Sequence, residues 1–148
     1  MIDVAWTPYC GPAPDPAEAL GRWNGDLILL SVMAAATTAG LILLREQQRG
    51  RFSAAMAVLA VGFISPLCAL SSALFMARTL HHLLLVLAAA PLLALCLPRL
   101  KPPRLAAATA VQAVVFWVWH APEPYAQALS HDGIYWLMQI SILGSAVW

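Results

Sequence analysis

Residues 75–98, FMARTLHHLLLVLAAAPLLALCLP, form an apolar stretch that is long enough to cross a lipid bilayer. Near its start the stretch carries Arg78, His81 and His82, three side chains that hydrocarbon disfavours. Placing an ionisable side chain inside a spanning segment costs a few kcal/mol, so such a residue is by default a candidate for a functional role. The sequence therefore predicts a membrane-spanning helix with a functional site near one end.

The composition of the whole chain supports a membrane location. Of its 148 residues, 61% are hydrophobic and only 10% are charged, and a water-soluble domain could not bury so much apolar surface. The net charge is +1 and no basic residues cluster on a polar face, so nucleic acid is not an expected partner. The lipid bilayer is the expected solvent for most of the chain.

Apolar runs separated by short polar segments divide the chain into spanning segments. The sequence predicts an all-α fold, a polytopic transmembrane helix bundle with about five spanning segments. An N-terminal tail over 1–26 precedes a transmembrane helical domain over 27–148, whose segments are expected at about 27–44, 52–66, 75–97, 105–120 and 130–148. The final apolar run, Ile134–Trp148, reaches only about 22 Å as a helix, so we expect a truncated form of a longer protein.

Basic residues in short loops set the expected orientation. Six of the eight Lys and Arg residues fall in two loops, 45–51 and 98–104, which lie on one side if every segment spans once. The opposite side receives most of the acidic residues, in the N-terminal tail and in a polar loop that extends to Gly133. We therefore expect the N-terminus outside and the two basic loops in the cytoplasm. The tail lacks the pattern of a cleavable signal peptide.

All four histidines are expected on the outer side of the membrane. His81 and His82 lie near the outer end of the third segment, His120 ends the fourth, and His131 lies in the outer loop. Neutral imidazole is a common metal ligand, and thiol or thioether partners favour copper(I). Because His81 and His82 diverge by about 100° around a helix, a metal site needs one of them together with His120 and a third group.

Each of these side chains also has a purely structural interpretation. A histidine at an outer helix end more often bonds to a backbone carbonyl, and Arg78 is most simply an anchor whose charged group reaches the surface. The cysteines Cys10, Cys68 and Cys96 are widely spaced, form no CxxC motif and indicate no disulfide framework. Cys68 and Cys96 are typical small apolar residues, whereas Cys10 lies in the exposed tail.

Two longer motifs are similar to those of a known family. SPLCALSSALFMARTLHHLLLVLAAAPLLAL and the later VWHAPEPYAQAL resemble the CtaG family of cytochrome c oxidase assembly factors. The matching residues are Ser65-Pro66-Leu67, His82 with Leu83-Leu84-Leu85 and Pro91-Leu92-Leu93, and Trp119-His120-Ala121-Pro122 with Tyr125, Ala128 and Leu129. YCGPAP and GRWN in the tail resemble the short proteobacterial branch, and the likeness covers most of the chain.

The resemblance implies a multi-pass protein of the bacterial inner (plasma) membrane that helps to mature the copper centre of a haem–copper oxidase. Cytochrome c oxidase subunits would be its partners, and copper would be held at the outer face. His82 and His120 are the positions that carry over best as metal ligands, with His81 as a third or neighbouring ligand. Many members have a histidine where this chain has Arg78, and further histidines in the helix that here contains Tyr135. Typical members also continue through further helices.

Two functional hypotheses of different classes follow. The first is a non-enzymatic assembly factor that acts with oxidase subunits and copper. The second is a non-metal structural or interaction subunit of a respiratory membrane complex, in which the outer polar patch binds a partner. A transporter would need polar groups along the whole crossing, yet the inner halves of the helices are almost entirely Ala, Leu and Val. No nucleophile–base pair that would indicate an enzyme is discernible.

Overall fold

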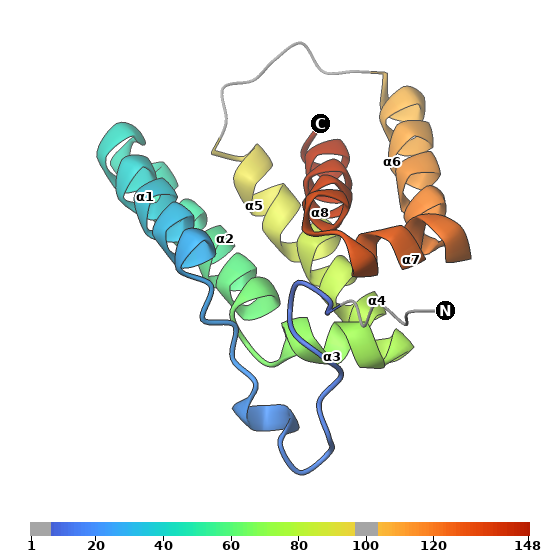
Figure 1. The fold of residues 1–148 in the computed structure, drawn as a ribbon. Coiled ribbons are helices and arrows are strands. Elements are labelled where there is room, and N and C mark those ends of the chain that lie inside the picture. The colour runs from blue at the N-terminus through green and yellow to red at the C-terminus, as the bar shows by residue number, and fades with distance from the viewer. Residues whose placement is uncertain (1–6, 97–103) are drawn as a thin grey trace.

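A computed structural model describes residues 7–96 and 104–148, and all regular secondary structure in these residues is helical. The predicted all-α class is therefore confirmed. In Figure 1 the longer helices run between two ends of a bundle. The N-terminal tail and the short helices α3 (Leu67–Ala73) and α7 (Pro122–Ser130) lie at one end, called here the tail end. The α1–α2 turn, the end of α5 and the start of α6 lie at the other, called here the turn end.

Two antiparallel helices, α1 (Leu27–Leu43) and α2 (Glu46–Phe63), form a hairpin. Asp26 caps α1, because its carboxylate accepts two backbone N–H groups of the first helical turn. Gly40 allows the two helices to approach closely, since a Cβ atom added to it would lie 2.1 Å from a ring carbon of Phe52. The first predicted segment is thus a helix, packed against the second.

The start of α2 differs from the prediction. The predicted loop over 45–51 is wrong, because α2 begins at Glu46 and carries Arg49 and Arg51 in its first two turns. Glu, Gln and Arg are good helix formers, so the helix extends past the apolar run that sequence analysis used as its limit. The second helix therefore starts before the predicted segment 52–66.

A bend separates α2 from α3, a short helix that sequence analysis missed. The two helix axes differ by 46° across the residues Ser65 and Pro66. Proline lacks a backbone N–H and cannot continue the hydrogen bonding of α2. The Ser65 hydroxyl instead donates to the backbone carbonyl of Val61 at 2.5 Å and completes the last turn. The chain therefore bends at the serine–proline pair, as the proline predicts.

The long apolar stretch forms one continuous helix over Phe75–Ala94, as predicted. It consists of α4 (Phe75–Leu83), the π-helical segment η2 (Leu84–Ala89) and α5 (Ala90–Ala94). The π-helical segment ends two residues before Pro91, which cannot donate to the carbonyl one turn earlier and so loosens the hydrogen bonding there. The last residue of the predicted segment and most of the second basic loop lie outside the described part of the chain.

Three helices complete the chain: α6 (Leu105–His120), α7 and α8 (Asp132–Val147). α6 and α8 agree with the predicted fourth and fifth segments. The polar loop predicted between these segments is wrong, because α7 occupies most of it and lies at 70° to α6. Pro122 stands at the first position of α7, where proline favours a helix start. The same proline therefore ends one helix and begins the next.

Helix length and composition bear directly on membrane crossing. Among the described residues, the helix Phe75–Ala94 is long and apolar enough to span a membrane by itself. The number of such units rises to three if the bent pairs α2–α3 and α6–α7 each count as one span, and α1 is a shorter apolar helix. Five spans and an outside N-terminus stay predictions.

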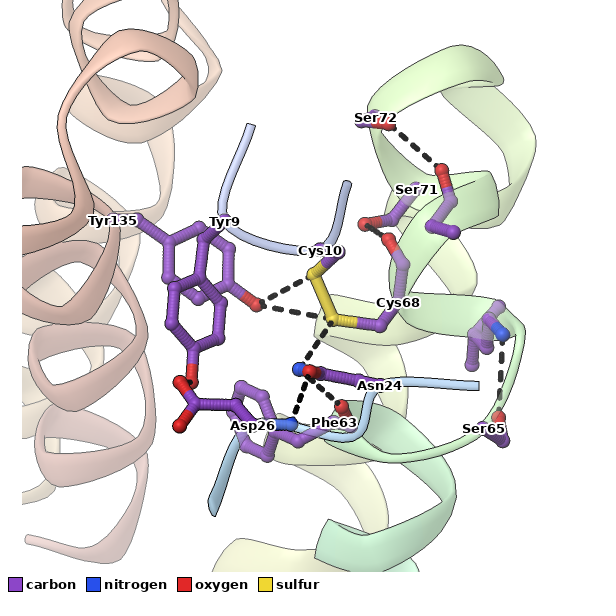
Figure 2. The surroundings of a disulfide bond; sticks show 12 residues. Tyr9, Cys10, Asn24, Asp26, Phe63, Ser65, Cys68, Ser71, Ser72 and Tyr135 are labelled. Atoms are coloured by element: carbon purple, nitrogen blue, oxygen red, sulfur yellow. Dashed lines mark hydrogen bonds between the residues drawn. A yellow bond between two sulfur atoms is a disulfide. The ribbon is translucent and has the colours of Figure 1, made fainter. Parts of the chain in front are cut away.

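A disulfide bond between Cys10 and Cys68 links the N-terminal tail to α3 (Figure 2). The expectation of no disulfide is therefore wrong. The two cysteines are 58 residues apart in the sequence, and only the fold brings their Cα atoms within 5.4 Å. The tail continues through a 3₁₀ turn, η1 (Ala19–Gly21), and returns to the bundle where the backbone N–H of Asn24 donates to the carbonyl of Ile64.

The hydrophobic core lies where α2, η2, α7 and α8 meet. Its buried members are Leu29, Met56, Leu59, Phe63, Leu85, Ala89, Tyr125, Ala128, Tyr135, Met138 and Ile142. Three polar side chains, those of His81, His82 and Gln139, are also buried among the described residues. Burying a polar group costs free energy unless the group has a hydrogen-bond partner, so these three residues mark the region where a functional site is expected.

Candidate functional site

His82 and His120 meet at the tail end of the bundle. His82 lies in the last turn of α4 and is almost fully buried, and His120 is the last residue of α6 and is partly buried. Nδ1 of His82 lies 3.4 Å from Nε2 of His120, and the two ring centroids are 5.1 Å apart in an edge-to-face arrangement. The fold thus brings together the two histidines that the sequence resemblance singles out.

The second ring nitrogen of His120 orients its imidazole. Nδ1 of His120 lies 2.7 Å from the backbone carbonyl oxygen of Phe116, one turn earlier in α6, and must carry a proton to donate to it. The phenyl ring of Phe116 stacks on the imidazole, with centroids 4.1 Å apart. In a neutral imidazole this arrangement leaves Nε2 unprotonated and facing His82.

The distance between the two nitrogens suits a shared metal ion. With metal–nitrogen bonds of about 2.0 Å, a tetrahedral ion holds two ligand nitrogens about 3.3 Å apart and a trigonal ion holds them about 3.5 Å apart. The 3.4 Å between Nδ1 of His82 and Nε2 of His120 lies between these values. Without an ion, the same contact is a long hydrogen bond donated by Nδ1 of His82. The pair therefore fits either arrangement.

His81, the third predicted ligand, does not join the pair. Its ring lies edge-on to Phe63, with centroids 5.1 Å apart, and its centroid is 5.7 Å from that of His82. Both ring nitrogens of His81 are buried without a hydrogen-bond partner among the described residues. In the same part of the chain, no three His, Cys, Asp or Glu side chains are arranged to hold one metal ion. The divergence of neighbouring residues around a helix explains this separation.

Arg78 lies one turn before His82 and stacks on Tyr125 of α7. The central guanidinium carbon is 3.3 Å from the centroid of the tyrosine ring, a cation–π contact. The tyrosine hydroxyl donates to the backbone carbonyl of Ser71 in α3 at 3.2 Å. The partner of Arg78 is therefore Tyr125 of α7, a helix that lies where the sequence predicted a loop.

A small cavity lies beside His82. Its volume is about 10 Å³, roughly the room that one water molecule needs. The side chains that line it come from the tail, α3, α4, α7 and α8, and they include Cys10, Arg78, His82, Tyr135, Met138 and Gln139. The cavity therefore lies between His82 of the pair and Cys10 of the disulfide.

Figure 2 shows that α8 and the tail both reach the disulfide. The Tyr135 hydroxyl lies 3.4 Å from Sγ of Cys10 and 3.7 Å from Sγ of Cys68. Nδ2 of Asn24 donates to the carbonyl of Phe63 at 3.2 Å and lies 4.0 Å from Sγ of Cys68. Sequence analysis missed this cluster, because an odd number of cysteines does not reveal which two pair. The one available signal was the position of Cys10 in the tail.

Tyr9 and Asp26 form a hydrogen bond that docks the tail on the start of α1 (Figure 2). The Tyr9 hydroxyl donates to Oδ2 of Asp26 at 2.5 Å, and its ring stacks on Tyr135 with centroids 4.9 Å apart. Burial, and then the hydrogen bond to the carboxylate, raises the pKa of Tyr9. The same hydrogen bond, followed by the one from the backbone N–H of Ile28, holds the pKa of Asp26 below its usual range.

His131 and Cys96 lie outside this cluster. His131 precedes α8, its side chain is exposed, and its Nδ1 lies 2.9 Å from the hydroxyl of Ser130. Cys96 is a free, buried cysteine just after α5, and its Sγ donates to the carbonyl of Leu92 at 3.2 Å. Both residues therefore serve as internal controls for experiments on the site.

Comparison with curated proteins and with solved structures finds no match. A family model, described as cytochrome c oxidase caa3 assembly factor (Caa3_CtaG), matches residues 44–148. The matched part contains helices α2 to α8, with both histidines of the pair, and the resemblance noted in the sequence is confirmed. Because the match covers well over half of the chain, the protein belongs to the family of cytochrome c oxidase caa3 assembly factors.

Proposed function

We propose that this protein assists the assembly of a haem–copper cytochrome c oxidase by holding copper at the outer face of the bacterial inner membrane. Membership of a family of oxidase assembly factors supports the assembly role. The observation that carries the copper role is the 3.4 Å approach of Nδ1 of His82 to Nε2 of His120. Oxidase subunits are the partners that this role requires, and the role involves no enzymatic step.

Two imidazoles from different helices suit a metal that must be passed on. The hydrogen bond from Nδ1 of His120 to the carbonyl of Phe116 fixes the tautomer and the ring orientation, as in many metal sites. Two protein ligands leave coordination positions open for the ligands of a recipient protein. Copper is therefore cargo in this proposal, and the residues hold and orient it.

Redox chemistry and charge both support an outer location of the tail end. The Cys10–Cys68 disulfide lies at this end, and disulfides persist in compartments such as the bacterial periplasm, whereas the cytoplasm keeps thiols reduced. Basic residues near the ends of helices at the turn end are Arg45, Arg49, Arg51 and Arg104. Short cytoplasmic loops of membrane proteins are rich in such residues. In this proposal the chain is multi-pass, with its N-terminus outside.

Copper binding by purified variants tests the ligand assignment. The protein is kept oxidised in detergent micelles, loaded with copper(I) without oxygen and desalted, and bound copper is counted by atomic absorption. We expect His82→Ala and His120→Ala each to lose the equivalent that the pair holds. His131→Ala, which removes an exposed histidine outside the site, should retain the parental copper content. Equal copper in all these proteins would refute the assignment.

His81→Ala adds a second comparison within the same experiment. In our proposal His81 is a neighbour that packs on Phe63, so its variant should keep most of the bound copper. A loss as large as that of His82→Ala would make His81 the third ligand. Oxidase copper content in cells that produce each variant then shows whether bound copper reaches the oxidase.

A non-metal role is the second candidate, and the same contact supports it. Without an ion, the hydrogen bond between the two imidazoles rigidifies a polar patch that could bind an oxidase subunit. Stable copurification with an oxidase at fixed stoichiometry, with no copper in the complex, would favour a structural or interaction subunit. Copper that depends on His82 and His120 would favour the first function.

A further inference from the structure

We propose that Cys10 and Cys68, once reduced, form a second binding site, for copper(I), next to the His82–His120 pair. Cys68 lies within the part of the chain that the family model matches, and Cys10 lies before it. The site lies at the tail end, where α3, α8 and the tail meet (Figure 2). This inference goes beyond the copper role of the histidines, and it can be tested in a chain from which the histidine pair has been removed.

The surroundings of the two sulfur atoms suit thiolates better than they suit a disulfide. The Tyr135 hydroxyl is buried, and its hydrogen-bond partners among the described residues are the two sulfur atoms, at 3.4 and 3.7 Å. The side-chain N–H of Asn24 lies within 4.0 Å of one of them. A disulfide sulfur accepts hydrogen bonds only weakly, whereas a charged thiolate is stabilised by donated hydrogen bonds.

Contacts other than the disulfide keep the two cysteines close together. Tyr9, the residue before Cys10, donates to Asp26 at 2.5 Å and stacks on Tyr135. Cys68 is fixed in α3 and fully buried. Reduction therefore leaves Cys10 anchored near Cys68, with Cα atoms that are 5.4 Å apart in the oxidised form. Two thiolates anchored in this way can bind one ion.

The adjoining cavity adds further ligands of the type that copper(I) prefers. Cys10, His82 and Met138 all line it, so sulfur and imidazole groups face the same small space. Thiolate and thioether ligands select copper(I) over harder ions. The cavity therefore connects Cys10 of the proposed thiolate site with His82 of the imidazole pair, and an ion could pass from one to the other.

Arg78 supplies the charge that such a complex requires. Copper(I) bound by two thiolates carries a net charge of −1, and a buried anion is stable only near a compensating positive charge. The guanidinium of Arg78 lines the cavity that Cys10 and His82 also line. The positive charge of Arg78 therefore favours an anionic copper–thiolate complex in this cavity.

The site opens by thiol–disulfide exchange. A dithiol reductant transfers two electrons and two protons to the Cys10–Cys68 pair: the sulfur–sulfur bond breaks, two thiols form, and the reductant becomes a disulfide. Copper(I) then displaces the two thiol protons, which leave to solvent. The oxidised pair has no thiolate to offer, so binding is confined to the reduced protein.

Copper(I) titration of a chain without the histidine pair tests this inference. The full chain with His82→Ala and His120→Ala is reduced, freed of reductant without oxygen, and titrated with copper(I) against the chelator bicinchoninate. We expect one tightly bound equivalent, which is absent after re-oxidation with oxidised glutathione and absent after Cys10→Ser and Cys68→Ser. Cys96→Ser should retain the equivalent, because Cys96 is a free cysteine outside the site.

Two readouts separate the possible outcomes. Alkylation and mass spectrometry should count three free thiols in the reduced chain and one in the oxidised chain. Because re-oxidation of one protein is itself a control, poor folding of the serine variants does not compromise the test. Equal copper binding by the reduced and oxidised chains would overturn the thiolate site and leave the histidine assignment to its own experiment.

Discussion

Arg78 carries a positive charge one turn from His82, and its contacts show how the protein accommodates it. The guanidinium carbon lies 3.3 Å from the centroid of Tyr125, where the negative face of the ring offsets the charge. Its Nε atom is buried without a hydrogen-bond partner among the described residues. The aromatic ring is therefore the main partner that the structure gives this cation.

A double-mutant cycle between Arg78→Gln and Tyr125→Leu measures this contact. We expect a coupling free energy of about 0.5–2 kcal/mol in unfolding experiments in mixed micelles, because a partly desolvated cation–π pair is lost. Tyr125→Phe keeps the ring but removes the hydroxyl that donates to Ser71, so it should retain most of the coupling. Additive effects of the two substitutions would show that the ring does not stabilise the charge.

Asp26 makes the docking of the tail sensitive to acid. Hydrogen bonds from the Tyr9 hydroxyl and the backbone N–H of Ile28 hold its pKa below the unfolded value of about 3.9. A lowered folded-state pKa contributes stability above the unfolded pKa, and this contribution is lost as the pH falls through the folded value. The Tm of the parent should therefore fall more than that of Asp26→Asn between about pH 5 and about pH 3.

Asp15→Asn is the control for this pH dependence, because Asp15 lies in the same tail. It should show the parental fall in Tm over the same range. An Asp26→Asn variant that still shows the full parental fall would mean that other carboxyl groups cause the acid sensitivity.

The packing of α1 on α2 depends on Gly40. A Cβ atom there would lie 2.1 Å from one ring carbon of Phe52 and 2.5 Å from another, so a larger side chain must displace the ring or the helix. We expect Gly40→Leu to lower the free energy of unfolding by about 1–3 kcal/mol, the usual cost of overpacking. Among the described residues, no atom beyond the backbone of its own helix lies within 4 Å of a Cβ atom added to Gly144 in α8, so Gly144→Leu should change the free energy of unfolding by less than about 0.5 kcal/mol.

Phe52→Ala provides a second check on the hairpin. Combined with Gly40→Leu, it should recover part of the lost stability, because the smaller residue makes room for the leucine. Equal losses from the two glycine variants in denaturant unfolding would contradict a specific contact between α1 and α2.

The sequence predicts the longer apolar helices well and the short helices poorly. α1, α6 and the helix Phe75–Ala94 coincide with runs of apolar residues, which are the strongest signal of a buried or lipid-facing helix. α3 has seven residues and follows Pro66, and α7 has nine residues and begins with Pro122, so neither forms a long apolar run that would reveal it. The polar first turns of α2 were missed for a related reason, since apolar periodicity does not extend to helix ends in water.

The candidate site is predictable in part, because His82 and His120 lie near the same ends of their helices. Their 3.4 Å approach needs only the helix directions and lengths to be right. The disulfide, by contrast, joins residues far apart in sequence, and its formation depends on how the tail folds back. The stacking of Arg78 on Tyr125 depends on α7, so a prediction that lacked this helix could not include it.

The two ends of the whole molecule differ in charge and in redox chemistry. The disulfide and the acidic residues Asp26, Glu123 and Asp132 lie in elements of the tail end. The arginines that begin α2 and α6 lie at the turn end. An oxidising compartment favours the first set and a cytoplasmic surface favours the second, so the two kinds of residue support the same orientation.

Labelling with a membrane-impermeant maleimide tests that orientation. The Cys96→Ser chain retains the Cys10–Cys68 disulfide, which does not react, and single cysteines are then introduced at two exposed positions, Arg49 and His131. We expect His131→Cys to react in intact cells whose outer membrane has been permeabilised, and Arg49→Cys to react only after lysis. The opposite pattern would place the disulfide in a reducing compartment, where it would not persist, and the histidine pair on the wrong side for a copper centre at the outer face. The orientation of the chain therefore decides whether the cysteine and histidine sites, which lie at the same end of the bundle, face the compartment of the copper centre.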